Sequence, residues 1–306
     1  MKILVISSNL IGDTILSTGV IDYFLINNPT AKFTFLIGPT AAQIYEHFPS
    51  LDKVIVIKKR KLNLHWIEMY LNCRKTKWDI VIDLRSSLIS YFFNVKKRYI
   101  FKKKENLHHI DQLKKSFNLK LAPLNIYTSN YEDEEVVKNL DQKYKYIVIF
   151  PGGNWAPKIW PIKSYNDLLK QLYKNYLNIR FIIVGSKKEK KLYLENIKKN
   201  LPDDIFIDIM GENLTLTSAY MKKSLLFIGN DSGLTHLSFA SNLSTIGLFG
   251  PTNDKVYGHR NNKNFVIRTV ENYNYEDRDL INQNITYMNS INIEAILDII
   301  NKNRLI

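Results

Sequence analysis

The chain has 306 residues, which is more than one hydrophobic core usually serves, so we expect two domains. Its composition, 45% hydrophobic and 24% charged, excludes a disordered or fibrous protein, and its single cysteine, Cys73, excludes an internal disulfide. No apolar run is long enough to span a bilayer, and polar residues interrupt any signal-peptide core at the N-terminus. We therefore expect a soluble cytoplasmic protein.

Apolar strands alternate with helices in the first half of the chain. Strands are predicted over 2–7, 32–38, 53–57, 79–84 and 98–103, and helices over 13–27, 39–47 and 64–75. Strands that are apolar throughout indicate a parallel sheet that is buried on both faces.

A polar and acidic segment, 124–145, separates this half from a second series of the same kind. Strands are predicted over 146–150, 179–185, 204–209, 225–229 and 244–250, and helices over 164–176, 187–199, 215–223 and 233–241. Apolar residues at helical spacing in 291–300 predict a final helix. The fold class predicted is α/β, with two Rossmann-like doubly wound parallel-sheet domains facing each other across a cleft.

The net charge of +14 is concentrated in one segment. Residues 53–104 contain fifteen Lys or Arg and three acidic residues, so they carry +12 of that total. Such density predicts an anionic partner: nucleic acid, an acidic membrane surface or a phosphorylated substrate. No zinc-finger or RNP1 pattern accompanies it, which favours the acidic surface or substrate. A solvated face in a lysine-rich chain is the alternative, since only nine of the 43 basic residues are arginine.

GNDSGLTHLSFA (229–240) carries the strongest local signal. It reads as a strand, a turn and a helix start, where Asp231 or Ser232 caps the helix and backbone amides form an anion site that Gly233 leaves open to a phosphate. His236 lies one turn after Ser232 and faces the same side. The alternative is a plain helix cap with a satisfied core histidine.

Two more loops follow strands of the same predicted sheet. PGGNWAPKIWP (151–161) holds Lys158 between two prolines, in reach of a phosphate, and FGPTND (249–254) presents the Thr252 hydroxyl. Either could instead be a packing loop, but three phosphate-suited loops at one sheet edge favour a binding site. Glu189 is suited to accept hydrogen bonds from ribose hydroxyls, or simply begins a helix.

In the first domain, NLIGDT (9–14) joins the first strand to the first helix. It has neither G-x-G-x-x-G nor G-x-x-x-x-G-K-[ST], so it predicts neither a dinucleotide fingerprint nor a P-loop. It offers one carboxylate, Asp13, at the carboxyl end of a strand, either as a site residue or as a helix cap.

Together, in this order and spacing, these segments resemble glycosyltransferase family 9, the ADP-heptose:lipopolysaccharide heptosyltransferases. DIVIDLRSSLIS (79–90), IIVGSKKE (182–189) and MGENLTL (210–216) extend the match through most of the chain. The resemblance implies a GT-B fold with an acceptor-binding domain over 1–143, a nucleotide-sugar domain over 144–286 and a tail helix, 287–306, that packs back toward the first domain. The chain departs from the family pattern in SSNLIGD, where members commonly carry an Arg before I-G-D, and at Gly19, where a Pro is usual.

The resemblance also implies an inverting, metal-independent transfer with no cofactor beyond a nucleotide-diphosphate sugar as co-substrate. Asp13 would be the general base. The donor would be bound by Lys158, Glu189, Met210, Gly211, Asp231, Ser232, Gly233, His236 and Thr252. No D-x-D metal-binding pair stands where a sugar nucleotide would need it, so no metal site is predicted.

The expected donor is ADP-heptose and the expected acceptor is a lipopolysaccharide core or related anionic glycolipid at the inner face of the cytoplasmic membrane, with no nucleic acid as partner. An acceptor and membrane patch is predicted at Lys58, Lys59, Arg60, Lys61, Lys96, Lys97, Arg98, Lys102, Lys103 and Lys104. Another nucleotide sugar, or a non-catalytic module that binds nucleotide sugar or nucleic acid, is the alternative.

Overall fold

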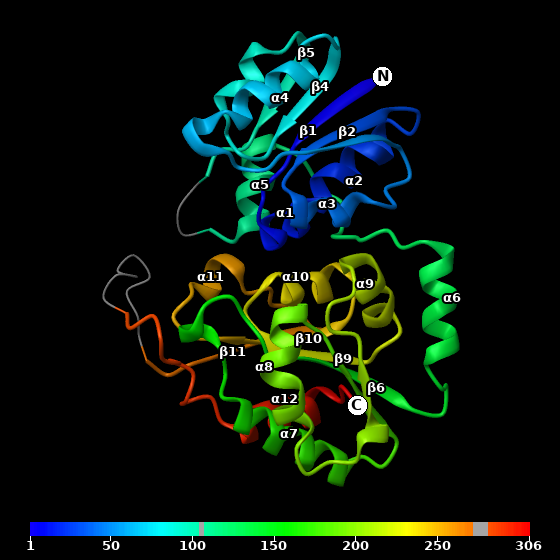
Figure 1. Cartoon of the computed structure of the whole chain (residues 1–306), viewed down its shortest axis with the longest axis vertical. Helices are drawn as coiled ribbons and strands as arrows, with labels where there is room; N and C mark the ends of the chain where they lie inside the picture. The colour runs from blue at the N-terminus through cyan, green and yellow to red at the C-terminus, as the bar shows by residue number, and fades with distance from the viewer. Residues whose placement is uncertain (104–106, 272–280) are drawn as a thin grey trace. The chain divides into compact units, whose positions relative to one another are not determined.

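The computed structural model describes residues 1–103, 107–271 and 281–306 (Figure 1). The chain divides into two compact units, Met1–Ser129 and Asn130–Ile306. This division falls before the helix α6 (Asn130–Asn139), whereas the predicted domain boundary, at 143, falls after it.

The first unit is built on a five-stranded sheet in which every pair of neighbouring strands is parallel. Its order is β3-β2-β1-β4-β5. The strands are β1 (Lys2–Ile6), β2 (Lys32–Ile37), β3 (Leu51–Val56), β4 (Trp78–Asp83) and β5 (Val95–Ile100). The central strand β1 is buried from its second residue onward, as expected of a strand with helices on both faces.

Helices and short 3₁₀ turns connect these strands: α1 (Ile11–Leu16), α2 (Thr18–Asn27), α3 (Pro39–Ala42), η1 (Gln43–Tyr45), η2 (Lys61–Asn63), α4 (His65–Cys73), η3 (Leu88–Phe92) and α5 (His109–Phe117). The single helix predicted over 13–27 is interrupted at Ser17, whose hydroxyl donates to the carbonyl of Asp13 at 2.7 Å. Helix α5 was not predicted from the sequence.

After α5 the chain runs as an extended strap along α2. The amide of Ala122 donates to the carbonyl of Gly19 (3.1 Å), and the amide of Asn125 donates to the Thr18 hydroxyl (3.2 Å). A methyl group on Gly19 would collide with the carbonyl oxygen of Ala122, so the strap approaches more closely than any larger residue permits. This contact explains the glycine at position 19.

The second unit holds a six-stranded sheet, also parallel throughout, in the order β11-β10-β9-β6-β7-β8. The strands are β6 (Lys145–Phe150), β7 (Ile179–Ile183), β8 (Phe206–Asp208), β9 (Leu226–Asn230), β10 (Ser244–Phe249) and β11 (Asn264–Arg268). The prediction of two doubly wound parallel sheets is therefore confirmed, with β11 as a strand that the sequence did not disclose.

Its helices are α6, α7 (Ile162–Asn175), α8 (Lys187–Lys198), α9 (Leu214–Lys222), α10 (Gly233–Ala240), α11 (Asp254–Tyr257) and α12 (Ile293–Asn303), with 3₁₀ turns η4 (Ala156–Lys158) and η5 (Asp203–Ile205). Helix α6 packs on α9, where Glu132 accepts from the Thr215 hydroxyl at 2.5 Å and Asn139 donates to the Tyr220 hydroxyl at 2.8 Å. Part of the acidic segment therefore forms a helix that packs in the second unit.

The tail helix α12 packs within the second unit, against α7 and β11. Ile296 and Ile300, from its predicted apolar stripe, join the core of that unit. The apolar stripe therefore packs into the core of the second unit. Packing of the tail toward the first domain stays a prediction.

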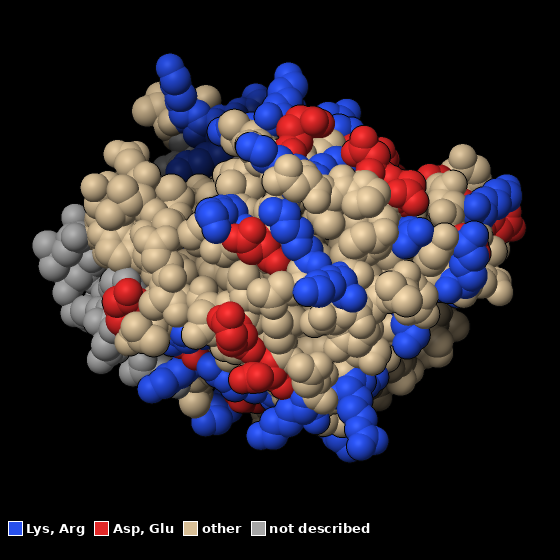
Figure 2. All heavy atoms as spheres, turned by 90° about the horizontal axis from the view of Figure 1, so that it is seen from below, with Lys and Arg blue, Asp and Glu red and all other residues tan. Residues whose placement is uncertain are grey.

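Surface charge is mixed on the side of the molecule that carries α7 and α12, where basic and acidic side chains are interspersed (Figure 2). Ion pairs such as Lys163–Asp167 at 2.6 Å account for part of this pattern. Among the helices that the structure describes, none is long and apolar enough to cross a membrane.

The buried carboxyl of Asp22 on α2 gives the strap a pH-dependent anchor. It accepts a hydrogen bond from the Tyr127 hydroxyl at 3.3 Å, and burial raises its pKa to about 6. Between about pH 4 and pH 6 the folded protein therefore holds a proton that the unfolded chain has released, so the free energy of unfolding falls as the pH rises through this window.

We expect Asp22→Asn to remove this dependence while it keeps an oxygen acceptor for Tyr127. Relative to the natural protein, the variant should gain on the order of 2 kcal/mol of unfolding free energy near pH 7 and little near pH 4. Urea unfolding at several pH values measures the difference, with the exposed Asp298→Asn as control. A difference that stays constant from about pH 4 to pH 7 would show that Asp22 does not titrate there.

Candidate functional site

The order of the second sheet places a topological switch between β6 and β9. Strands β6, β7 and β8 follow one another in one direction, and β9, β10 and β11 follow in the other. In open parallel sheets, ligands bind at the carboxyl ends of the strands at such a point. The loop after β6 begins with Pro151 and the loop after β9 with Asp231, so both predicted glycine-containing motifs flank the switch.

Asn230, the last residue of β9, joins these two loops through its buried amide. Its Nδ2 donates to the carbonyls of Pro151 (3.1 Å) and Gly152 (2.8 Å). Its Oδ1 accepts from the amide of Trp160 (3.1 Å) and from the hydroxyl of Tyr165 (2.9 Å). One fully buried side chain therefore fixes both ends of the loop that carries Lys158.

Lys158 and Asp231 meet above this network, with 3.7 Å between Nζ and Oδ2. Both side chains are largely buried, at 14% and 6% exposed. Helix α10 begins two residues after Asp231: Ser232 is its N-cap, and the Ser232 hydroxyl accepts from the amide of Leu234 at 3.1 Å. A lysine beside the first turn of a helix, whose amides point outward, is an arrangement suited to an anion.

The loop after β10 brings Thr252 to the same sheet edge. Its Oγ1 is buried, and among the described residues it has no hydrogen-bond partner. The backbone of the loop is held from β11, since Arg268 Nη1 donates to the carbonyl of Thr252 at 2.7 Å. A buried hydroxyl left without a partner costs free energy unless a ligand satisfies it.

Glu189 lies against the glycine loop and also begins α8. Its Oε2 accepts from the amide and the hydroxyl of Ser186, both at 2.7 Å, and the Ser186 hydroxyl accepts from the amide of Glu189. These reciprocal hydrogen bonds form a capping box at the start of α8. Glu189 therefore has the structural role that the sequence analysis gave as the alternative to ribose binding. Its Oε1 touches Gly152, where a methyl group would collide with it, so a ribose-binding role stays a prediction.

Met210 and Gly211, predicted to line the pocket for the base, follow β8 and contact the end of β7. A methyl group on Gly185 would lie 2.6 Å from Met210 Cε, and the amide of Gly211 donates to the carbonyl of Gly185 at 2.7 Å. Gly211 has φ of 96°, in the region that favours glycine. The loops after β6, β7 and β8 are thus in mutual contact.

His236 is buried in α10, among aromatic rings. Its ring centroid lies 5.8 Å from that of Phe239 and 6.3 Å from that of Tyr257. Such surroundings are those of a core histidine, which the sequence analysis gave as the alternative to a donor-binding role. Contact between His236 and the donor stays a prediction.

Asp13 belongs to the first unit, where β1 and β4 form the corresponding switch point. It lies in the first turn of α1, but the N-cap is Leu10 and no side chain caps this helix. Its Oδ2 accepts from the Ser8 hydroxyl at 3.4 Å. The carboxylate is therefore not used as a helix cap, while Asn9 of the same loop lies against Gly38.

His109, at the start of α5, is a neighbour of Asp13 that the sequence analysis missed. Burial lowers the pKa of His109, and the nearby Asp13 carboxylate opposes this by favouring the charged imidazole. Lys103 lies close enough to lower the pKa further. No local motif marks this histidine, because it reaches Asp13 only through the placement of α5.

The predicted basic patch is divided between the two edges of the first sheet. Lys58–Lys61 follow β3, and Lys102 and Lys103 follow β5, so they lie at the carboxyl edge with Asp13. Lys96 lies near the start of β5 and pairs with Asp79 at 2.6 Å, and Arg98 donates to the carbonyls of Ser90 and Phe93. Lys97 lies over the ring of Tyr99. Lys104 is outside the described residues.

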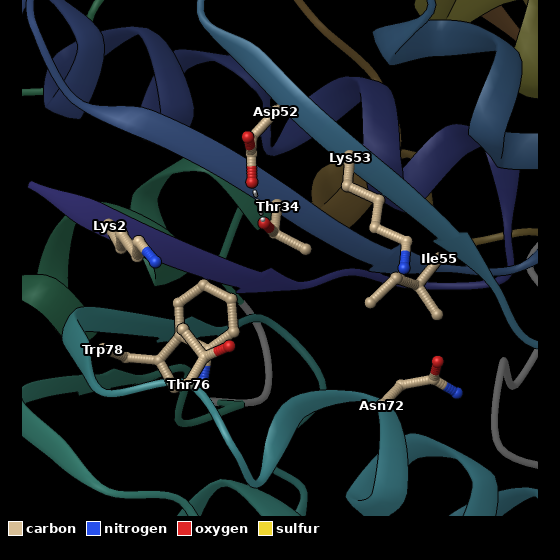
Figure 3. Close-up of a pocket in the computed structure, with 8 residues that line it drawn as sticks. All are labelled: Lys2, Thr34, Asp52, Lys53, Ile55, Asn72, Thr76 and Trp78. Atoms are coloured by element: carbon tan, nitrogen blue, oxygen red, sulfur yellow. Dashed lines mark hydrogen bonds between the residues drawn. The ribbon is translucent and has the colours of Figure 1, made fainter.

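A pocket of ≈130 Å³ opens at the opposite, amino-terminal edge of the same sheet (Figure 3). It is lined by Lys2, Thr34, Asp52, Lys53, Ile55, Asn72, Thr76 and Trp78. Ligands of parallel sheets bind at the carboxyl edge, so this pocket does not belong to the site. In the part of the chain that the structure describes, no group of three or more His, Cys, Asp or Glu side chains is arranged to hold a metal ion.

We expect Asn230→Ala to destabilise the second unit, because it leaves the buried Trp160 amide without its acceptor and the carbonyls of Pro151 and Gly152 without their donor, while the Tyr165 hydroxyl keeps the carbonyl of Phe150. The cost should be about 3 kcal/mol, measured by urea unfolding. The exposed Asn196→Ala on α8 is the control, and it should change stability by less than about 0.5 kcal/mol. Equal stability of the two variants would contradict the role given to Asn230.

Comparison with known proteins gives the family. The sequence profile of Glycosyltransferase family 9 (heptosyltransferase) matches residues 94–287. Lipopolysaccharide heptosyltransferase 1 of Campylobacter coli is 26% identical over 307 aligned positions, which cover 88% of this chain and 90% of that protein.

Solved structures show the same fold. A glycosyl transferase family 9 protein from Veillonella parvula matches with a TM-score of 0.80 and 20% identity, over 99% of this chain and 97% of that one. The ADP-heptose lps heptosyltransferase II of Escherichia coli matches with a TM-score of 0.74 and 20% identity, over 100% and 99%. The fold is therefore GT-B, and since the family profile covers more than half of the sequence, this chain belongs to glycosyltransferase family 9 and is a transferase enzyme.

Proposed function

We propose that the protein transfers a heptose from ADP-heptose to a lipopolysaccharide core or a related anionic glycolipid, with inversion and without a metal ion. The observation that carries this proposal is the set of groups at the switch point of the second sheet: the Lys158 ammonium, the start of α10 and the Thr252 hydroxyl, which has no hydrogen-bond partner among the residues that the structure describes. The heptose and the glycolipid are supported by the family and by the names of the relatives.

The leaving group is a nucleoside diphosphate, and negative charge develops on it as the bond to the sugar breaks. Groups already oriented toward that charge stabilise the transition state without reorganising. Lys158 supplies a full positive charge, while the first-turn amides of α10 and the Thr252 hydroxyl supply hydrogen-bond donors. The long contact between Lys158 and Asp231 orients the ammonium and leaves it able to bind phosphate oxygens.

The acceptor is activated in the first unit, in this proposal by Asp13. Its carboxylate removes the proton of the acceptor hydroxyl as the hydroxyl oxygen attacks the anomeric carbon of the heptose. A new carbon–oxygen bond forms, the bond to the diphosphate breaks on the opposite face, and ADP leaves with its electron pair. Base and donor belong to different units, so the reaction requires the two to meet.

The cations at the carboxyl edge of the first sheet suit an anionic acceptor. Lys58–Lys61 and Lys102–Lys103 lie at the edge where Asp13 is found. Phosphate or carboxylate groups of a glycolipid are the ligands that such cations recognise. We propose peripheral contact with the inner face of the cytoplasmic membrane on the same grounds.

Thermal unfolding with ADP-, UDP-, GDP- and CDP-sugars tests the donor. A ligand at a hundred times its dissociation constant should stabilise the fold by about 2.7 kcal/mol. Stabilisation by ADP-heptose alone supports the proposal. A larger shift with another nucleotide sugar would replace the heptose, and no shift with any of them would contradict the site.

We expect Asp13→Asn and Lys158→Met to separate the two halves of the mechanism. Asp13→Asn should slow transfer by about 10²–10⁴-fold with normal donor binding, since it removes only the base. Lys158→Met should weaken donor binding by about tenfold to a hundredfold, since it removes a charge-assisted contact. Transfer kinetics and donor titration measure both effects.

Lys163→Met, which removes an exposed lysine of α7, is the matched control and should leave donor binding unchanged. Unchanged transfer in Asp13→Asn would exclude Asp13 as the base. Transfer that is lost on adding EDTA and restored by Mg²⁺ would contradict the metal-independent mechanism.

A further inference from the structure

Helix α4 of the first unit is apolar on two opposite faces. His65, Met69 and Cys73 point inward, and Met69 and Cys73 join the core beneath the sheet. Ile67 and Leu71 lie on the other side of the helix, where both are exposed. A surface helix ordinarily carries polar residues on its outer face, so this outer stripe is not explained by the fold of the unit.

The neighbouring 3₁₀ turn η3 extends the apolar surface. Leu88 and Phe92 are 73% and 71% exposed. The turn contacts α4, and the rings of Tyr70 and Phe93 stack with 6.4 Å between their centroids. The apolar surface of this part of the unit consists of the exposed side chains of α4 and of the contacting turn η3, with Leu62 and Leu64 from the segment directly before α4. We call this surface the apolar wedge: Leu62, Leu64, Ile67, Leu71, Leu88 and Phe92.

Leu62 is the most exposed member of the wedge and has a strained backbone. Its side chain is 91% exposed, and its φ of 53° lies in the left-handed region that disfavours a branched residue. Glycine or asparagine would adopt this conformation at lower cost. A leucine there costs stability and presents an apolar side chain to water, so the folded chain alone gains nothing from it.

Exposed cations flank the wedge in the chain. Lys58–Lys61 precede it and Arg74, Lys75 and Lys77 follow α4, all exposed. Arg60 pairs with Glu68 at 3.1 Å. Burial lowers the pKa of His65, and the nearby cations Arg85 and Lys59 lower it further. Exposed apolar groups on neighbouring elements, flanked by exposed cations, are features of proteins that lie on anionic lipid.

We propose that the apolar wedge inserts into the interfacial region of an anionic lipid bilayer while the surrounding lysines and arginines bind the headgroups. Lipid accounts for both parts of the surface: nucleic acid would use the cations but not the exposed leucines, and a second copy would place two basic rims against each other. The inference deepens the proposed glycolipid acceptor by naming how the first unit reaches it, but the insertion itself does not depend on heptose transfer.

The single cysteine makes insertion measurable at chosen positions. Cys73 is buried, so Leu62→Cys, Ile67→Cys and Leu177→Cys can each be labelled with an environment-sensitive fluorophore. Leu177, which is 89% exposed in the second unit, is the matched control. With vesicles that contain phosphatidylglycerol, we expect a blue shift and quenching by brominated lipid at positions 62 and 67, and neither at 177.

A second set of variants tests what the wedge contributes to binding. Leu62→Ser with Ile67→Ser and Phe92→Ser should weaken sedimentation with these vesicles by at least about tenfold, because three inserted side chains lose their apolar groups. Leu177→Ser with Leu192→Ser should bind as the natural protein does. Stabilisation by ADP-heptose should be equal in all of them, which separates this proposal from that of the donor site.

Three outcomes would overturn the inference. If salt abolishes vesicle binding and the fluorophores at positions 62 and 67 show no blue shift, the protein is held by electrostatic attraction without insertion. A blue shift that grows with protein concentration in the absence of lipid would assign the wedge to self-association. Spectral changes with RNA or DNA but not with vesicles would assign it to nucleic acid.

Discussion

The buried amide of Asn230 is the interaction on which the candidate donor site depends. Two parallel strands that are neighbours in the sheet but far apart in the chain, β6 and β9, end side by side, and nothing in their ladder fixes the loops beyond them. Asn230 does so, since it uses both amide hydrogens and its oxygen within the protein. Lys158, the start of α10 and the glycine loop are thereby held in one geometry before any ligand arrives. Such preorganisation favours electrostatic catalysis, because moving groups into place during the reaction would cost free energy and reduce the stabilisation of the transition state.

The two units use the same architecture for opposite chemistry. Each has a parallel sheet whose strand order reverses once, and in each the candidate residues follow the strands at that reversal. In the second unit the switch point carries a lysine and a helix N-terminus, which suit an anion. In the first it carries a carboxylate, Asp13, with His109 and Lys103 nearby, which suits proton transfer beside an anionic partner. The strand order of each sheet determines where the candidate residues lie, and the sequences of the loops determine whether the site is positively or negatively charged.

Much of this could be predicted from the sequence, because buried parallel strands are continuous apolar runs and their loops carry glycine, proline and polar residues at fixed places. The strands β1 to β4 and β6 to β10 and the motifs that follow them are predicted in this way. What failed depends on tertiary contacts. No helix is predicted at α6, because the acidic composition of that segment gives no sign of the contact that Glu132 makes with Thr215. The sequence predicts only a turn at Asn230 and gives no signal for His109, because the residues that each of them contacts are far away in the sequence. The basic block was treated as one patch, although β5 places Lys96 and Lys102 toward opposite ends of the strand.

The uneven distribution of charge follows from the difference between the two proposed substrates. A nucleotide sugar diffuses in water and can be recognised by a few groups, so the second unit needs no extended field. Basic and acidic side chains are interspersed over its α7 and α12 face (Figure 2). A glycolipid acceptor is confined to a surface, and an enzyme that acts on it gains by binding that surface, where the substrate is concentrated in two dimensions. Headgroup attraction alone is screened by salt, whereas apolar insertion is not, so the proposed combination of the two would hold the first unit at a membrane under conditions in which either would be weak. The proposed membrane acceptor would then account for an exposed, strained Leu62.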